Sequence, residues 1–179
     1  MNKEEKKEQI KKLLINTDRP GIKILIDILE EKGYFENKAS LKYHGNYEGG
    51  LMDHSFNMFN ELKVFMPEEN INTLAIIAFL HDVCKVGLYT ENGYNKEHPK
   101  GHATLSLTMI KDLIKLTDFE EKAIKYHMGL YSTFEFNTNP WQNGEYSLKE
   151  LTNEWNKEPK LKLVHWSDDK ASQFVDITK

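Results

Sequence analysis

The stretch INTLAIIAFLHDVCKV, from Ile71 to Val86, decides the fold. Its apolar residues cover the whole circumference of a helix, which in a soluble protein predicts a central helix buried on all sides. His81 and Asp82 lie near the end of this stretch and therefore start from a buried position. A buried carboxylate near the carboxyl end of a helix is costly without a cationic partner. Two cationic partners are possible for Asp82: Lys85, about one helical turn further on, or a metal ion.

Outward from this stretch, helical periodicity extends over most of the 179 residues, and sustained strand-like alternation does not appear. We predict an all-α protein that forms a single domain over 1–179, with N-terminal helices in 1–40 and a helical core in 41–175. Pro20 marks a helix start, and Gly129 a helix stop. The predicted helices are 3–15, 20–32, 51–65, 71–85, 101–116, 118–128, 147–156 and 160–175.

Composition excludes several classes of protein. The charged amino terminus is unlike a signal peptide and no run of about 18 apolar residues occurs, so we expect a cytoplasmic protein without a membrane partner. Cys84 is the single cysteine, which excludes an intramolecular disulfide and a zinc knuckle and leaves metal binding to nitrogen and oxygen ligands. The net charge is -4 and Arg19 is the single arginine. Without a basic stripe, we expect a small ligand and not a nucleic acid duplex.

Several other helices carry a histidine on an apolar face, as the periodicity of each segment indicates. In the last helix, periodicity selects Asp168 over Asp169 for the inward side. The inward stripes are Leu51, His54, Met58, Leu62 and Phe65; His102, Leu105, Met109, Leu113 and Leu116; and Phe119, Ala123, Ile124 and His127.

One buried histidine is ordinary, since a backbone carbonyl can satisfy it. Five helices that each bury a histidine or an aspartate are better explained by shared cations, which satisfy many polar groups at once. We therefore predict a metal centre built from five core helices. Its candidate ligands are His54, His81, Asp82, His102, His127 and Asp168.

The same residues carry a resemblance to a known family. Their order, H…HD…H…H…D, resembles that of the HD superfamily of metal-dependent phosphohydrolases. Local context agrees over about residues 40 to 175, and it is similar to small single-domain HD hydrolases of bacteria and phages. The matching pieces are KYHGNYEGGLMDHS from Lys42, LHDVCKVG from Leu80, HPKGH from His98 and HWSDDKAS from His165. The resemblance implies a helical HD fold.

The resemblance also implies two metal sites that share Asp82 as a bridging, catalytic ligand. It assigns His54, His81, Asp82 and Asp168 to one site, and Asp82, His102 and His127 to the other. Two divalent transition-metal ions would occupy them, with Mn, Fe, Co or Ni expected first and Mg or Zn also compatible. Such a pair can clamp a phosphoryl group and activate a shared water to hydroxide. Lys85 would stabilise phosphoryl charge beside them, or else serve as a charge at a helix end.

Other positions keep two interpretations each. His44 and His98 are candidates for substrate binding, and both can equally be loop histidines. His165 precedes Asp168 by one turn and could orient that carboxylate. The aromatic segment 131–147 is either a lid that stacks a nucleobase or a loop packed by its own side chains.

These observations favour a metal-dependent phosphohydrolase or phosphodiesterase acting on a nucleotide or another small phosphate ester. Some HD relatives, including inositol oxygenase and phosphonate-cleaving enzymes, use the same ligand types as mixed-valent diiron oxygenases, so the ligands leave that alternative open. A third possible function is that of a 3'-5' exonuclease-like nucleic acid hydrolase, because GGLMDHS resembles the HD domain of certain exoribonucleases. Fewer than about 50 residues precede this motif, which are too few for a typical oligonucleotide-binding barrel. The sequence does not indicate an oligomeric state.

Overall fold

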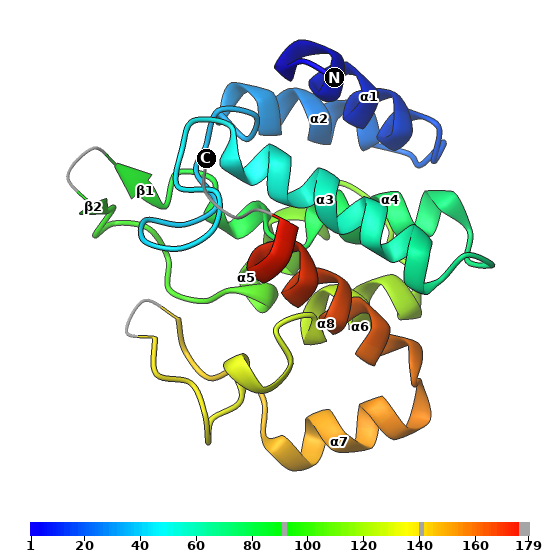
Figure 1. Cartoon of the computed structure of the whole chain (residues 1–179), viewed down its shortest axis with the longest axis vertical. Helices are drawn as coiled ribbons and strands as arrows, with labels where there is room; N and C mark the ends of the chain where they lie inside the picture. The colour runs from blue at the N-terminus through cyan, green and yellow to red at the C-terminus, as the bar shows by residue number, and fades with distance from the viewer. Residues whose placement is uncertain (91–92, 140–141, 176–179) are drawn as a thin grey trace.

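The computed structural model describes residues 1–90, 93–139 and 142–175, and it confirms the all-α prediction (Figure 1). The α-helices are α1 (Lys3–Ile15), α2 (Ile22–Glu31), α3 (Gly50–Phe65), α4 (Ile71–Leu80), α5 (Ala103–Ile110), α6 (Asp118–Tyr126), α7 (Leu148–Lys157) and α8 (Lys160–Lys170). Short helical turns are η1 (Val83–Lys85), η2 (Gly129–Ser132) and the π-helical η3 (Ala171–Val175). A small antiparallel hairpin, β1 (Tyr89–Thr90) and β2 (Gly93–Tyr94), was not predicted.

The core lies around α4, as its sequence predicts. All residues from Leu74 to Leu80 are at most 1% exposed, so this part of the helix is buried on every side, whereas Ile71 in its first turn is exposed. Helix α3 packs along α4 and against α8, and α1 packs on α4. Figure 1 shows α1 and α2 at one end of the molecule and α7 at the other. None of the helices within the described residues has the length and hydrophobicity needed to cross a bilayer.

The chain leaves α-helical geometry at Asp82, directly after His81, although sequence periodicity placed both residues inside helix 71–85. Helix α4 ends at Leu80, and Asp82 has φ -112° and ψ 17°, outside the α-helical region. In an unbroken helix, adjacent side chains diverge by about 100°. The break therefore lets His81 and Asp82 face the same centre.

Helix α5 differs from the predicted helix 101–116 in both length and phase. His102 has φ -135° and ψ -93°, so the helix begins after it. The predicted stripe started from His102 and therefore had the wrong phase. The buried face consists of Ala103, Ser106 and Ile110, while the predicted Leu105 and Met109 are only partly buried.

An ion pair between the half-buried Arg19 and the buried Glu120 joins the loop after α1 to the start of α6. Glu120 is fully buried, its Oε1 lies 2.5 Å from Arg19 Nη2, and its Oε2 accepts a hydrogen bond from Thr117 N. Removing one partner of a buried pair leaves an uncompensated charge. We expect Arg19→Ala to lower the free energy of unfolding by about 3 kcal/mol in urea denaturation. Arg19→Lys keeps the charge, so its free energy of unfolding should fall by less. Equal unfolding free energies of Arg19→Ala and the parent would contradict this prediction.

Candidate metal centre

Asp82 lies between two pairs of histidines. Its Oδ2 is 3.3 Å from His81 Nε2 and 3.6 Å from His54 Nε2. Its Oδ1 is 3.1 Å from His102 Nε2 and 3.7 Å from His127 Nε2. Each carboxylate oxygen therefore faces its own pair of imidazoles, which is the geometry of a bridging ligand.

Asp168 adds a second carboxylate to the first pair. Its Oδ1 lies 3.0 Å from His54 Nε2 and 3.7 Å from His81 Nε2. The neighbouring Asp169 instead accepts a hydrogen bond from Gln173. The predicted inward orientation of Asp168 is confirmed, since its residue is 9% exposed. We call His54, His81, Asp82 and Asp168 the first ligand group, and Asp82, His102 and His127 the second.

The donor atoms fit a cation. His81 Nδ1 donates to Ala78 O at 2.8 Å and His127 Nδ1 donates to Ile124 O at 2.6 Å, which leaves each Nε2 with a lone pair. His81 Nε2 lies 3.2 Å from His54 Nε2, and His127 Nε2 lies 3.1 Å from His102 Nε2. Lone pairs that converge at these distances need a proton or a metal ion between them. Oδ1 of Asp82 is also buried without a well-aligned donor among the described residues.

The ligands come from different parts of their helices. His54 and Asp168 lie within α3 and α8, whereas His81 and His127 directly follow α4 and α6 and His102 directly precedes α5. The prediction that all ligands project from within helices was wrong for these last three and for Asp82. At helix ends the backbone can deviate from ideal geometry, which allows side chains from five segments to converge on one point.

Lys85 is the cationic partner of Asp82 in this structure. Its Nζ lies 2.6 Å from Asp82 Oδ2, and both residues are buried. Burial opposes the charge of Lys85, but attraction to Asp82 raises the pKa of the ammonium above its usual value. Burial would likewise raise the pKa of the Asp82 carboxyl, but Lys85 and the neighbouring imidazoles hold that pKa well below its usual range. With Asp168 also ionised, two carboxylates face one ammonium, and the remaining negative charge can be balanced by a proton on an imidazole or by a metal ion.

The two ligand groups differ in how they hold protons. Burial lowers the pKa of His81, which keeps that imidazole neutral and ready to ligate. Burial acts the same way on His102, but electrostatic interactions with Cys84 and Asp82 outweigh it and raise the pKa of His102 well above its usual value. A metal ion in the second group must therefore displace a proton from His102.

This proton predicts a pH dependence of metal binding. The protonated form of His102 dominates below its raised pKa, so the affinity of the second group for Co²⁺ should increase as pH rises toward that value. Calorimetric titration in two buffers of different ionisation enthalpy should record about one proton released per chain in the second binding step. Identical apparent enthalpies in the two buffers would contradict the prediction.

The remaining predicted site residues lie as follows. The ring of His44, half-buried, is 4.8 Å from the ring of His54, beside the first group. Both ring nitrogens of His98 face carbonyl oxygens, at 2.9 Å from Pro99 O and 3.2 Å from Val86 O. These contacts hold the loop that carries His98 against the residues after η1.

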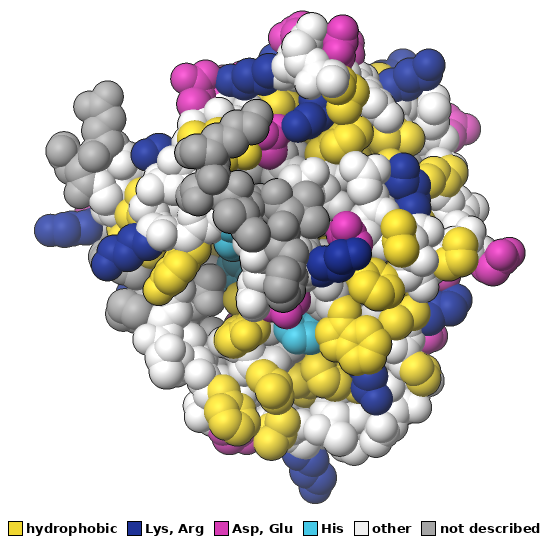
Figure 2. All heavy atoms as spheres, viewed as in Figure 1, with side chains coloured by type: hydrophobic (Ala, Val, Ile, Leu, Met, Phe, Trp, Pro, Cys, Tyr) yellow, Lys and Arg dark blue, Asp and Glu magenta, His cyan; other side chains and the backbone are white. Residues whose placement is uncertain are grey.

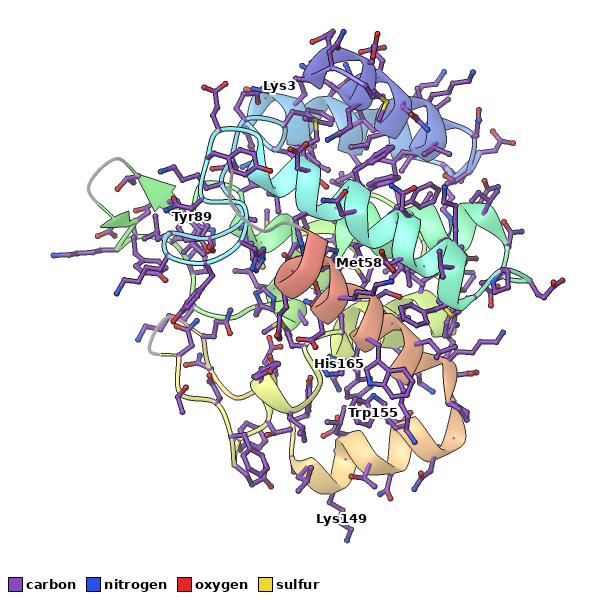
Figure 3. All side chains as sticks on the ribbon, viewed as in Figure 1. Lys3, Met58, Tyr89, Lys149, Trp155 and His165 are labelled. Atoms are coloured by element: carbon purple, nitrogen blue, oxygen red, sulfur yellow. The ribbon has the colours of Figure 1, made fainter. Side chains whose placement is uncertain are left out.

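His165 supports a different ligand from the one expected. Its Nδ1 donates to the backbone oxygen of His127 at 2.7 Å, instead of contacting the Asp168 carboxylate. Its ring stacks on Trp155 with 5.7 Å between centroids, and Figure 3 shows the two side chains together between α7 and α8. Helical spacing suggested Asp168, one turn away, but the His165 ring points to the segment after α6.

Gly129 lies directly against the His165 ring. Gly129 has φ +54°, and a Cβ built there would lie 2.7 Å from His165 Cε1. We expect Gly129→Ala to cost about 1–3 kcal/mol of unfolding free energy beyond its backbone strain, because the His165 ring must move. Gly87→Ala is the matched control, since Gly87 has φ +76° and no atom within 4 Å of such a Cβ. Equal losses in the two variants would show that the contact with His165 is unimportant.

Sequence reasoning missed two residues of the centre. Cys84 Sγ lies 3.4 Å from His102 Nδ1, and Cys84 forms a potential ligand cluster with Asp82 and His102, so sulfur was excluded too early. The position of Cys84 two residues after Asp82, within HDVCK, could have indicated that it belongs to the centre. Glu145, on the segment before α7, contacts the backbone of His102, and no local pattern marks it.

Comparison with known proteins gives one match. A family model described as HD domain matches residues 50–168, a span that contains the six candidate ligands and Lys85. No curated protein and no solved structure matches the chain.

Proposed function

The chain belongs to the HD-domain family, one of metal-dependent hydrolases, and from this membership we propose that it is a phosphohydrolase or phosphodiesterase acting on a nucleotide or another small phosphate ester. The observation that carries the proposal is Asp82, whose two oxygens face separate pairs of histidines. A carboxylate in this position suits two cations side by side.

We propose divalent transition-metal ions as cofactors, held by the first and second ligand groups. Nitrogen and oxygen donors suit Mn, Fe, Co or Ni. Such ions supply Lewis acidity toward a phosphoryl oxygen and lower the pKa of a bound water. The protein residues contribute a buried, preorganised set of donors, whose Nδ1 atoms are fixed by backbone carbonyls at His81 and His127.

Lys85 contributes a fixed positive charge. Its side chain is 10% exposed and is held by Asp82, so little reorganisation is needed when charge builds up on a phosphoryl oxygen. His44 lies at the edge of the first group, where a substrate contact is geometrically reasonable. On the face shown in Figure 2, cationic and anionic side chains are interspersed, which favours a small substrate over a duplex.

The proposal is tested by hydrolysis of a panel of phosphate esters by protein loaded with Mn²⁺, Co²⁺ or Ni²⁺. The panel contains nucleoside mono-, di- and triphosphates, cyclic nucleotides and a nitrophenyl diester, with Asp82→Ala as the control. Metal-dependent turnover of any member that the control lacks supports the proposal. No turnover by metal-loaded protein would refute it, and oxygen-dependent turnover by iron-loaded protein would favour the oxygenase alternative.

A further inference from the structure

Glu145 caps the helix that follows a candidate ligand. Its carboxylate accepts hydrogen bonds from three consecutive backbone N–H groups: His102 at 3.1 Å, Ala103 at 3.2 Å and Thr104 at 2.9 Å. These groups at the start of α5 have no intrahelical acceptors, and a carboxylate also complements the helix dipole there. Glu145 thus fixes the backbone from which the His102 imidazole projects.

The segment that carries Glu145 also reaches the other histidine of the second group. Glu145 N donates to Ser132 O at 2.8 Å, and the buried Tyr146 hydroxyl donates to Gly129 O at 2.9 Å. Gly129 in turn lies against His165, which binds the carbonyl of His127. Both histidines of the second group are therefore supported by residues 129–132 and 145–146. The ligands of the first group depend on α3, α4 and α8 instead.

We propose that Glu145 is a positioning residue that sets the affinity of the second ligand group for its metal ion, with no comparable effect on the first. This inference rests on the proposed metal centre. His102 Nδ1 faces the weak acceptor Cys84 Sγ at 3.4 Å, whereas the Nδ1 atoms of His81 and His127 are fixed by backbone carbonyls, so the orientation of His102 depends more on its backbone anchor. Without Glu145, the non-helical backbone at His102 loses its anchor and the Nε2 atom is no longer held toward Asp82. Loss of such an outer contact typically weakens metal affinity by about 10–100-fold.

The experiment is a calorimetric titration of the metal-free full chain with Co²⁺, alongside the absorption spectrum of bound cobalt. In the parent, two binding steps are expected. In Glu145→Ala, metal binding to the second ligand group should weaken by about 10–100-fold, and binding to the first group should stay unchanged. Glu145→Gln, which keeps one acceptor oxygen, should fall between the two. The matched control is Glu135→Ala, because Glu135 accepts from Leu148 N at 3.0 Å and so caps α7, which carries no candidate ligand.

The outcomes are distinguishable. Selective loss of the second step in the Glu145 variants, with two steps in Glu135→Ala, supports the inference. Equal weakening of both steps, or two unchanged steps, overturns it; Glu145→Gln decides if the Ala variant does not fold. A parent that binds no cobalt would instead refute the metal centre itself, and with it the proposed function.

Discussion

Asp82→Asn should abolish metal-dependent hydrolysis, with kcat/KM reduced by at least about 1,000-fold. Asparagine keeps the shape of the side chain, but one of its two terminal atoms becomes an NH₂ group that cannot ligate. Since Oδ1 and Oδ2 of Asp82 face different ligand groups, the substitution damages both. Elemental analysis of the purified variant, after supplementation with Mn²⁺ or Co²⁺, should find less than one ion per chain.

This variant also needs a stability control. In the metal-free protein, Asp82→Asn leaves the buried ammonium of Lys85 without its partner at 2.6 Å. Such a loss typically costs about 3–5 kcal/mol. The double variant Asp82→Asn/Lys85→Met removes both charges and should recover much of that free energy of unfolding. Activity must remain lost in the stable double variant; hydrolysis near the parent rate in either variant would refute the bridging role of Asp82.

The sequence predicts best where a ligand lies inside a long, regular helix. His54 and Asp168 were placed correctly on inward faces because the phase of α3 and α8 runs without interruption through them. The same reasoning succeeded for the burial of α4, whose residues are apolar on all sides. Hydrophobic periodicity reports burial directly, so it carries information wherever the helix is continuous.

Periodicity fails at helix ends, and the centre is built largely from such ends. The phase assigned to α5 was wrong because His102 lies outside the helix, and the break after Leu80 was not predicted. Backbone angles at these points depend on tertiary contacts, such as the one between Glu145 and His102, that connect residues far apart in sequence. The spacing between His165 and Asp168 was equally misleading. No pattern within a single segment indicates these long-range contacts or the backbone angles that depend on them.

Lys85→Met should reduce kcat of the metal-loaded enzyme by about 100–1,000-fold without reducing metal content. Methionine approximates the length and apolar stem of lysine and removes the charge. Because the ammonium lies 2.6 Å from Asp82 Oδ2, it competes with a cation for that oxygen, so the affinity of the metal-free variant for Co²⁺ should be equal to or higher than that of the parent.

The two measurements together separate the two roles of Lys85. If Lys85 only neutralises Asp82 until metal binds, Lys85→Met will bind metal more tightly and turn over substrate at the parent rate. If it also stabilises charge on the phosphoryl group, kcat will fall although both ions are present. Lys85→Arg keeps the charge on a larger, planar head group and should recover part of kcat. The position of the ammonium, buried at 8% residue exposure and held against the shared ligand, favours the second result.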